Sequence, residues 1–319
     1  MMSLSRVALA TLVALILAST PLGRAADAVG LTDDSPLATR PGIPSATLCE
    51  LGDAGHRRAT TMADEFLKEG KLYAAEACYL GALRYKSDFP MALYGLGEVH
   101  AKESRDALAR EAYQLAIDVW PQYVDARVAL GDLHARAGKR KLAEAAYTAA
   151  VDASPTDPLA WESLGKHQLS NRKFKQAAIT YKRALLAVKD GGMSPGLILG
   201  LARAAFGARR YPECVSHAER AASLAPGFGM ARHQLGKCKL AMGDVEGAVP
   251  ALREAARVEP DIPEHHVDLA EALVQYGTPG AAIAALEEGL AALEGDAVVE
   301  AALAKTKRAW GVGGDSRDL

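Results

Sequence analysis

Histidine and cysteine are the side chains of this sequence best suited to chemistry, and it contains eight of the first and four of the second. Imidazole and thiolate groups bind metal ions, and histidine also transfers protons near neutral pH. Metal sites hold these groups at short, defined spacings such as Cys-x-x-Cys, and no such pair occurs. His265 and His266 are adjacent, so on a helix their rings point to different faces. We therefore predict no metal site.

Patterns that bind phosphate are also absent, because the sequence contains neither a P-loop nor a Gly-x-Gly-x-x-Gly segment. No group of residues stands out as a nucleophile with its base. The sequence therefore predicts a protein without catalytic residues and without a cofactor.

Small and aromatic residues recur at a fixed spacing of 34 residues. Gly131, Ala143 and Tyr147 each have an identical residue 34 positions earlier, and matching residues follow later in the chain. A period of roughly 20 to 50 residues is the signature of a solenoid. His100 and His134 share the period, which favours packing positions for them, with a ligand role as the alternative. The predicted packing residues are Gly97, Gly131, Gly165, Gly236, Ala109, Ala143, Ala177 and Ala248.

Within this period the sequence resembles the tetratricopeptide repeat, a helix–turn–helix unit of 34 residues. The opening pattern of that family stands as Trp161-Glu-Ser-Leu164-Gly165, and Ala177 and Tyr181 complete it. The resemblance implies an all-α fold in which hairpins stack into a right-handed superhelix, an α-solenoid. It also implies a concave groove, lined by the first helix of each hairpin, that binds a protein or peptide partner.

The spacing predicts seven repeats, then a capping helix over 297–310 and a flexible tail over 311–319. Pro121 and Pro155 fall where second helices should end, because proline stops a helix. Three extra residues interrupt the period between the fourth and fifth repeats, near 189–194. The predicted repeats cover residues 56–89, 90–123, 124–157, 158–191, 195–228, 229–262 and 263–296.

The amino terminus has the pattern of an export signal. A positive start precedes the apolar run Val7–Ala18, and small residues follow near Ala25. This pattern predicts a signal peptide over 1–25, followed by a flexible leader over 26–54, in a periplasmic or secreted protein. An uncleaved membrane anchor is the alternative.

Export would place the cysteines in an oxidising compartment, where disulfides persist. Cys214 starts the second helix of the fifth predicted repeat, and Cys238 lies late in the first helix of the sixth. The resemblance makes these helices neighbours, so we predict a disulfide between them. A Cys49–Cys78 bridge requires the leader to fold back, and the alternative for Cys78 is a buried thiol.

By the resemblance, one column of the groove carries three acids and then three bases, and ends in an acid. Apolar residues and a histidine accompany its basic part, which predicts a pocket for an acidic or carboxylate-ended peptide. Ordinary solvated charge is the alternative. The column comprises Asp64, Glu98, Asp132, Lys166, Arg203, Lys237 and Glu271. The predicted partner-binding residues are Leu199, Arg203, Phe206, His233, Lys237 and Leu240.

Charge and motifs narrow the function. A net charge of −2 argues against a nucleic-acid partner, and no small-molecule substrate is evident. The early repeats have Thr60, Asp64 and Gly95 where a carboxylate clamp of this family has lysine and asparagines, so a chaperone-tail receptor is not predicted. We predict a non-catalytic, protein-binding scaffold of the cell envelope. The alternative is an accessory subunit of an envelope glycan-synthesis or export enzyme system, and the oligomeric state stays open.

Overall fold

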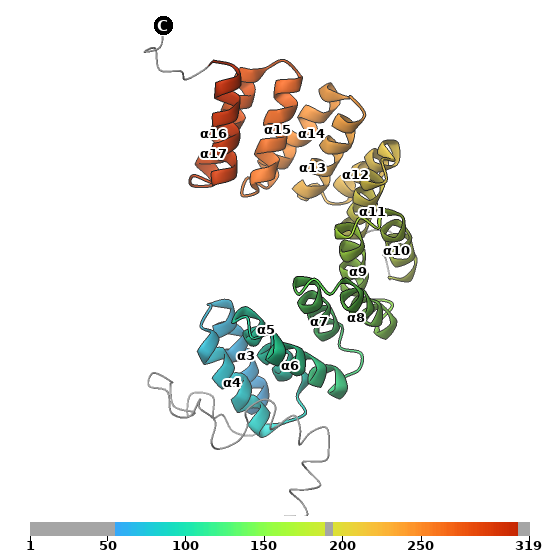
Figure 1. Cartoon of the computed structure of the whole chain (residues 1–319), viewed down its shortest axis with the longest axis vertical. Coiled ribbons are helices and arrows are strands. Elements are labelled where there is room, and N and C mark those ends of the chain that lie inside the picture. Colours follow the sequence, from blue (N-terminus) through green and yellow to red (C-terminus); the bar gives the residue numbers. More distant parts are fainter. Residues whose placement is uncertain (1–54, 189–193, 312–319) are drawn as a thin grey trace, which may run out of the picture. The chain divides into compact units, whose positions relative to one another are not determined.

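The computed structural model describes residues 55–188 and 194–311, and every regular element within these ranges is an α-helix (Figure 1). The predicted signal peptide, the leader and the insertion after the fourth repeat lie outside the described residues, apart from Ser194 at the end of the insertion. So does the predicted tail beyond Gly311. Within the described ranges, the prediction of an all-α fold is confirmed.

The chain divides into two compact units, Met1–Ser154 and Pro155–Leu319. The described helices of the first unit are α3 (Gly55–Lys68), α4 (Leu72–Tyr85), α5 (Pro90–Lys102), α6 (Asp106–Val119), α7 (Val124–Arg136) and α8 (Arg140–Ala153). Those of the second are α9 (Pro158–Ser170), α10 (Phe174–Ala187), α11 (Pro195–Gly207), α12 (Tyr211–Leu224), α13 (Gly229–Ala241), α14 (Val245–Val258), α15 (Pro263–Gln275), α16 (Pro279–Ala292) and α17 (Ala297–Ala309).

Within each unit, every helix packs against the helix that follows it, so the chain forms consecutive hairpins. First helices of adjacent hairpins also touch: α3 contacts α5 in the first unit, and α11 contacts α13 in the second. The last helix, α17, packs on both α15 and α16, as a capping helix must. None of the helices within the described ranges has the length and apolar character that a membrane crossing requires.

The turn inside each hairpin contains one residue with a positive φ angle. Glycine takes this place at Gly70, Gly138, Gly243 and Gly277, with φ of 71° to 85°. Residues with side chains take it at Ser104, Arg172 and Arg209, with φ of 58° to 60°. This left-handed backbone suits glycine because it has no Cβ to meet the following carbonyl. The other three turns therefore store a small strain.

The recurring glycines and tyrosines pack against one another inside the hairpins. A Cβ built on Gly131 would lie 2.5 Å from Cε1 of Tyr147, and the other predicted packing glycines face Tyr113, Tyr181 or Leu252 in the same way. Ala109, Ala143, Ala177 and Ala248 are wholly buried. The glycine therefore leaves room for the large side chain, tyrosine or leucine, of its own hairpin.

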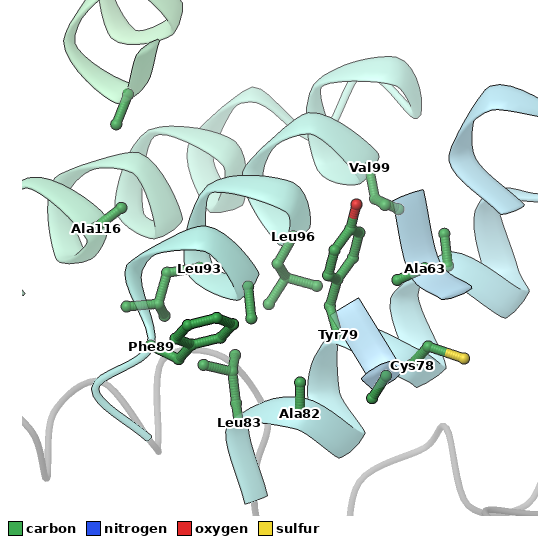
Figure 2. Close-up of a cluster of buried hydrophobic side chains, with 14 of the residues drawn as sticks. Ala63, Cys78, Tyr79, Ala82, Leu83, Phe89, Leu93, Leu96, Val99 and Ala116 are labelled. Carbon is green, nitrogen blue, oxygen red and sulfur yellow. The ribbon is translucent and has the colours of Figure 1, made fainter. Parts of the chain in front are cut away.

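The core between the first two hairpins shows how the units are filled (Figure 2). The ring of Tyr79 on α4 lies beside Leu96 on α5, and Phe89 lies between Leu83 and Leu93. A Cβ on Gly95 would also meet the ring of Tyr79, so this tyrosine fills space between successive hairpins as well. Burial of such side chains is the main stabilising contribution to the stack.

Candidate protein-binding face

The predicted groove column occupies one position on the first helix of every hairpin. We call its members in the first unit, Asp64, Glu98 and Asp132, the carboxylate row. The members in the second unit, which we call the mixed row, are Lys166, Arg203, Lys237 and Glu271. The two rows differ in their contacts.

Each carboxylate of the first row accepts a hydrogen bond from the packing tyrosine of its own hairpin. Tyr79 Oη lies 2.5 Å from Asp64 Oδ1, and Tyr147 Oη lies 2.5 Å from Asp132 Oδ1. Tyr113 donates to Glu98 in the same way. Burial, and then the hydrogen bond to Asp64, raises the pKa of the Tyr79 hydroxyl far above its usual value. The tyrosines therefore remain neutral donors and hold the carboxylates in fixed orientations.

This tyrosine–carboxylate pair was missed in the sequence analysis, although a signal for it exists. The acid precedes the tyrosine by 15 residues in each of the first three hairpins. Where the row carries a base, the residue 15 positions later is Tyr181, Ala218 or Leu252. Reading the two columns together would have predicted the bond.

An aromatic cluster lies next to the carboxylate row. The ring centroid of Tyr94 lies 5.7 Å from that of Tyr113 and 5.4 Å from that of Tyr123, and Trp120 stacks on Tyr123 at 4.8 Å. Burial, Glu98 and the exposed Asp125 raise the pKa of the Tyr94 hydroxyl. The charged groups acting on the Tyr94 ring are acidic, whereas Arg136 also acts on Tyr113.

The mixed row is largely neutralised by neighbouring acids. Lys237 Nζ lies 3.2 Å from Asp268 Oδ2, and His233 Nε2 lies 2.7 Å from the same oxygen. Burial opposes ionisation of Asp268, but the bonds from His233 and Lys237 outweigh it and lower the pKa of that carboxyl. Lys166 pairs with Glu162 at 3.0 Å. His233 and Lys237 are therefore brought together as predicted residues, but by an acid that the sequence analysis did not consider.

Arg203 is the exception in the mixed row. Within the described residues no carboxylate lies at ion-pair distance from its guanidinium, which instead has Nη2 3.8 Å from Met230 Sδ. Burial lowers the pKa of Arg203, and Tyr181 acts in the opposite direction. A partly buried cation without a counter-ion is a plain candidate for binding an anion.

The three apolar residues of the predicted pocket lie in three separate places. Leu199 is 4% exposed and packs with Ile198 and Ala222 rather than lining an open surface. Phe206 packs in the fifth hairpin, with its ring centroid 5.8 Å from that of Tyr211. Leu240 belongs to the core around α15 and α16. Leu199 is thus buried, against the expectation of an exposed leucine, whereas Phe206 and Leu240 are partly exposed, and their role in partner binding stays a prediction.

Two histidines, the partly exposed His233 and the buried His265, lie side by side on α13 and α15. The rings of His233 and His265 are 4.7 Å apart, and His265 has no solvent exposure. His265 Nδ1 lies 3.3 Å from the carbonyl oxygen of Glu259, while its Nε2 lies 3.9 Å from Glu259 Oε2. Burial, followed by repulsion from His233, lowers the pKa of His265. This ring is therefore neutral at neutral pH.

The cysteines of the second unit meet as the sequence analysis proposed. The structure pairs Cys214 on α12 with Cys238 on α13, with Cα atoms 5.9 Å apart, inside the range a disulfide needs. The amide of Gln234 lies 3.6 Å from Cys214 Sγ and 3.5 Å from Cys238 Sγ. Cys49 lies outside the described residues, so its pairing with Cys78 stays a prediction.

One serine lies in a hydrolase-like pattern that the sequence analysis overlooked, Gly192-Met-Ser194-Pro-Gly196. In serine hydrolases this pattern lies between a strand and a helix. Ser194 instead caps α11, where its Oγ lies 3.5 Å from the backbone nitrogen of Leu197, and the preceding described element is helix α10. The serine therefore serves as a helix cap.

The hairpins define the class of protein as an α-solenoid. Models of the family described as tetratricopeptide repeat match residues 60–124 and 128–196 in one case and residues 239–306 in another. Together they cover more than half of the chain, which therefore belongs to the tetratricopeptide repeat family. No curated protein sequence matches it.

Solved structures share the fold at low sequence identity. A tetratricopeptide repeat protein from Parabacteroides merdae has a TM-score of 0.59 and 15% identity, over 79% of this chain and 98% of that one. PilW, described as a type IV pilus biogenesis factor, has a TM-score of 0.55 and 19% identity, over 68% of this chain and 98% of that one. The APC/C hetero-tetramer Cut9–Hcn1 has a TM-score of 0.57 and 17% identity, over 80% of this chain but 49% of that one. These likenesses show a shared fold of stacked helical hairpins.

Proposed function

We propose that this chain is a non-catalytic scaffold whose carboxylate row binds a positively charged segment of a partner protein. The observation that carries the proposal is the bond from a buried tyrosine to each carboxylate of the row. A carboxylate has two oxygens, so one can accept the tyrosine proton while the other stays open to a lysine or arginine. Fixed orientation lowers the entropy lost on binding.

The surroundings of the row favour the same partner. Asp125 adds a fourth carboxylate that acts on Tyr94, and two arginines of α7 have partners of their own. Arg127 donates to the carbonyl of Pro121, and Arg136 lies 3.7 Å from Asp106. Trp120 of the aromatic cluster is 40% exposed and offers a ring on which a cation of the partner could stack. A basic segment therefore meets both complementary charge and aromatic surface.

The test compares two labelled peptides of equal length, one rich in lysine and arginine and one rich in aspartate and glutamate. Fluorescence anisotropy at low and high salt should give tighter, salt-sensitive binding of the basic peptide. The variant Asp64→Asn/Glu98→Gln/Asp132→Asn removes three charges but keeps an acceptor for each tyrosine. It should weaken binding of the basic peptide at least tenfold while the helical content stays constant.

A matched control removes three carboxylates elsewhere in the same unit. Asp88, Glu111 and Asp152 are exposed, so Asp88→Asn/Glu111→Gln/Asp152→Asn changes the net charge equally. Equal weakening by both triple variants would mean that only net charge matters and would refute the proposal. Tighter binding of the acidic peptide would refute it as well.

A second candidate site is Arg203. It supports the predicted binding of an acidic partner, but through this one residue and not through Arg203 and Lys237 together. Its guanidinium has no carboxylate partner among the described residues, whereas Lys237 is already bound to Asp268. Arg203→Gln should therefore weaken binding of the acidic peptide more than Lys237→Gln does. Equal effects of the two variants would remove Arg203 as the anion site.

We also propose that the chain is exported and acts in the cell envelope, on the evidence of the signal pattern over 1–25. Intact mass of protein from the envelope fraction should lack this segment. A full-length chain in the membrane would instead support the uncleaved anchor. Crosslinking in envelope extract distinguishes a scaffold from an accessory subunit, because only the latter should be recovered with a glycan-synthesis or export enzyme.

A further inference from the structure

Three side chains of the kinds that bind metal ions meet at the junction of the first two hairpins, and none of them belongs to the carboxylate row. Glu76 lies on α4, His100 on α5, and Glu103 directly follows α5. One ligand atom of each lies within 4.8 Å of the others. Glu76 is 4% exposed and His100 is 5% exposed. Buried groups of this kind need a partner, because an unpaired carboxylate or imidazole in the core is costly.

The imidazole of His100 lacks a partner at one nitrogen. Its Nδ1 is buried and accepts or donates no hydrogen bond, and it faces Glu76 Oε1 at 3.7 Å. That separation is too long for a hydrogen bond. It suits two ligands of one ion, because tetrahedral zinc with bonds of about 2.0–2.2 Å keeps neighbouring ligand atoms about 3.4 Å apart.

Arg105 supplies the positive charge at this junction. Its Nη2 donates to Glu76 Oε1 at 3.0 Å and also to Glu103. Its Nε is buried without an acceptor. The guanidinium therefore gives hydrogen bonds to both carboxylates while one of its own N–H groups remains without a partner. The Arg105 side chain is 37% exposed and can therefore swing into water. When Arg105 has moved away, the carboxylates of Glu76 and Glu103 remain close to each other and to His100.

We propose that Glu76, His100 and Glu103 form a binding site for a divalent transition-metal ion, which takes the place of Arg105. One imidazole and two carboxylates are ligands that zinc accepts, with water completing four positions. The site takes ligands from α4 and from the end of α5, which belong to successive hairpins. A bound ion would therefore fasten the first hairpin to the second.

The next hairpin provides a matched control. His134 stands at the position equivalent to His100, 34 residues later. The charged groups acting on it are Arg110 and Lys139, both basic. Among the described residues, no carboxylate is found acting on this imidazole with which it could share an ion. His134→Phe should thus leave metal binding unchanged, while His100→Phe should remove it.

The experiment titrates the purified chain, freed of metal by a chelator, with Zn²⁺ in a calorimeter. We expect one strong site that disappears in His100→Phe and weakens at least tenfold in Glu103→Gln. Arg105→Ala should bind Zn²⁺ more tightly, because the competing cation is gone. Zn²⁺ should also raise the melting temperature of the unaltered chain, since a ligand of the folded state stabilises it.

Glu103→Gln keeps the test decisive if His100→Phe does not fold, because Glu103 lies at a partly exposed helix end. The proposal is overturned if Glu103→Gln binds Zn²⁺ as the unaltered chain does, or if His134→Phe loses as much binding as His100→Phe. Unchanged or weaker binding by Arg105→Ala would overturn it too. These outcomes are independent of whether the carboxylate row binds a peptide.

Discussion

The ring of Tyr147 lies against Gly131, where a Cβ would come within 2.5 Å of its Cε1 atom. The ring cannot move aside freely, because it is 3% exposed and its hydroxyl is bonded to Asp132. Gly131→Ala should therefore lower the free energy of unfolding by about 1–3 kcal/mol through overpacking. Urea denaturation followed by circular dichroism measures this.

Gly280 on α16 is the control for that substitution. A Cβ there meets nothing within 4 Å, so Gly280→Ala should be neutral or should stabilise the helix by up to about 1 kcal/mol. Equal losses at both positions would show that the cost comes from the glycine backbone and not from the ring.

Arg172 occupies a turn position that favours glycine. Its φ is 58°, and its side chain is exposed. Arg172→Gly should raise the free energy of unfolding by about 1 kcal/mol, because glycine adopts the left-handed backbone without strain. Gly138, with φ of 71° in the same turn position, should lose a similar amount as Gly138→Ala. Opposite signs in these two variants are the expected result, and the same sign in both would contradict it.

His265 should make the protein less stable in mild acid. Its pKa is lowered in the folded state, so below the ordinary value of 6.5 the unfolded chain takes up a proton that the folded chain does not. The stabilisation of the folded state that neutral His265 provides is therefore complete above about pH 6.5. It is lost as the pH falls below that value. The groups that face it, directly or through His233, are His233, Glu259, Asp268 and Lys237.

His265→Gln keeps a donor for the Glu259 carbonyl but does not titrate in this range. The fall in melting temperature from pH 7.5 to pH 5.5 should be smaller in this variant than in the unaltered chain. Identical falls in the two proteins would show that another group controls the acid sensitivity.

The bridge between Cys214 and Cys238 closes a loop with a sequence separation of 24. Loop entropy predicts that it contributes about 3 kcal/mol. Cys214→Ala/Cys238→Ala should lower the urea midpoint accordingly, since alanine fits the position of Cys214 in the other hairpins. Peptide mass spectrometry after alkylation of the native chain checks the bond directly. Alkylation of both residues without reductant would disprove it.

The sequence predicted the fold well because its determinants are local and repeated. Gly131, Ala143 and Tyr147 lie within one hairpin, so their spacing alone reports how two helices pack. The partner-binding residues were harder to predict. The helix position of Leu199 indicated the groove, but whether its side chain faces water depends on the neighbouring hairpins, which place Ala231 and Leu185 in the same core cluster.

Interactions between hairpins explain the other gaps. Lys237 seemed free because Asp268, its partner, lies on the next first helix. His100 seemed an isolated packing residue because Glu76 belongs to the preceding hairpin. The 34-residue period reports the residues that all hairpins have in common. The pairs Lys237–Asp268 and His100–Glu76 each occur between two particular hairpins only. The two residues of each pair meet because of the way one hairpin packs on the next, which the sequence of a single hairpin does not report.

The pairing of Cys214 with Cys238 joins α12 to α13, which belong to successive hairpins. In a stack whose hairpins are stabilised mainly by their neighbours, unravelling starts at an end and travels inward. The cross-link prevents these two hairpins from separating when the last helices come loose. A protease that cuts the segment between α12 and α13 would leave both fragments attached until a reductant arrives. The chain can thus survive one backbone break at this position.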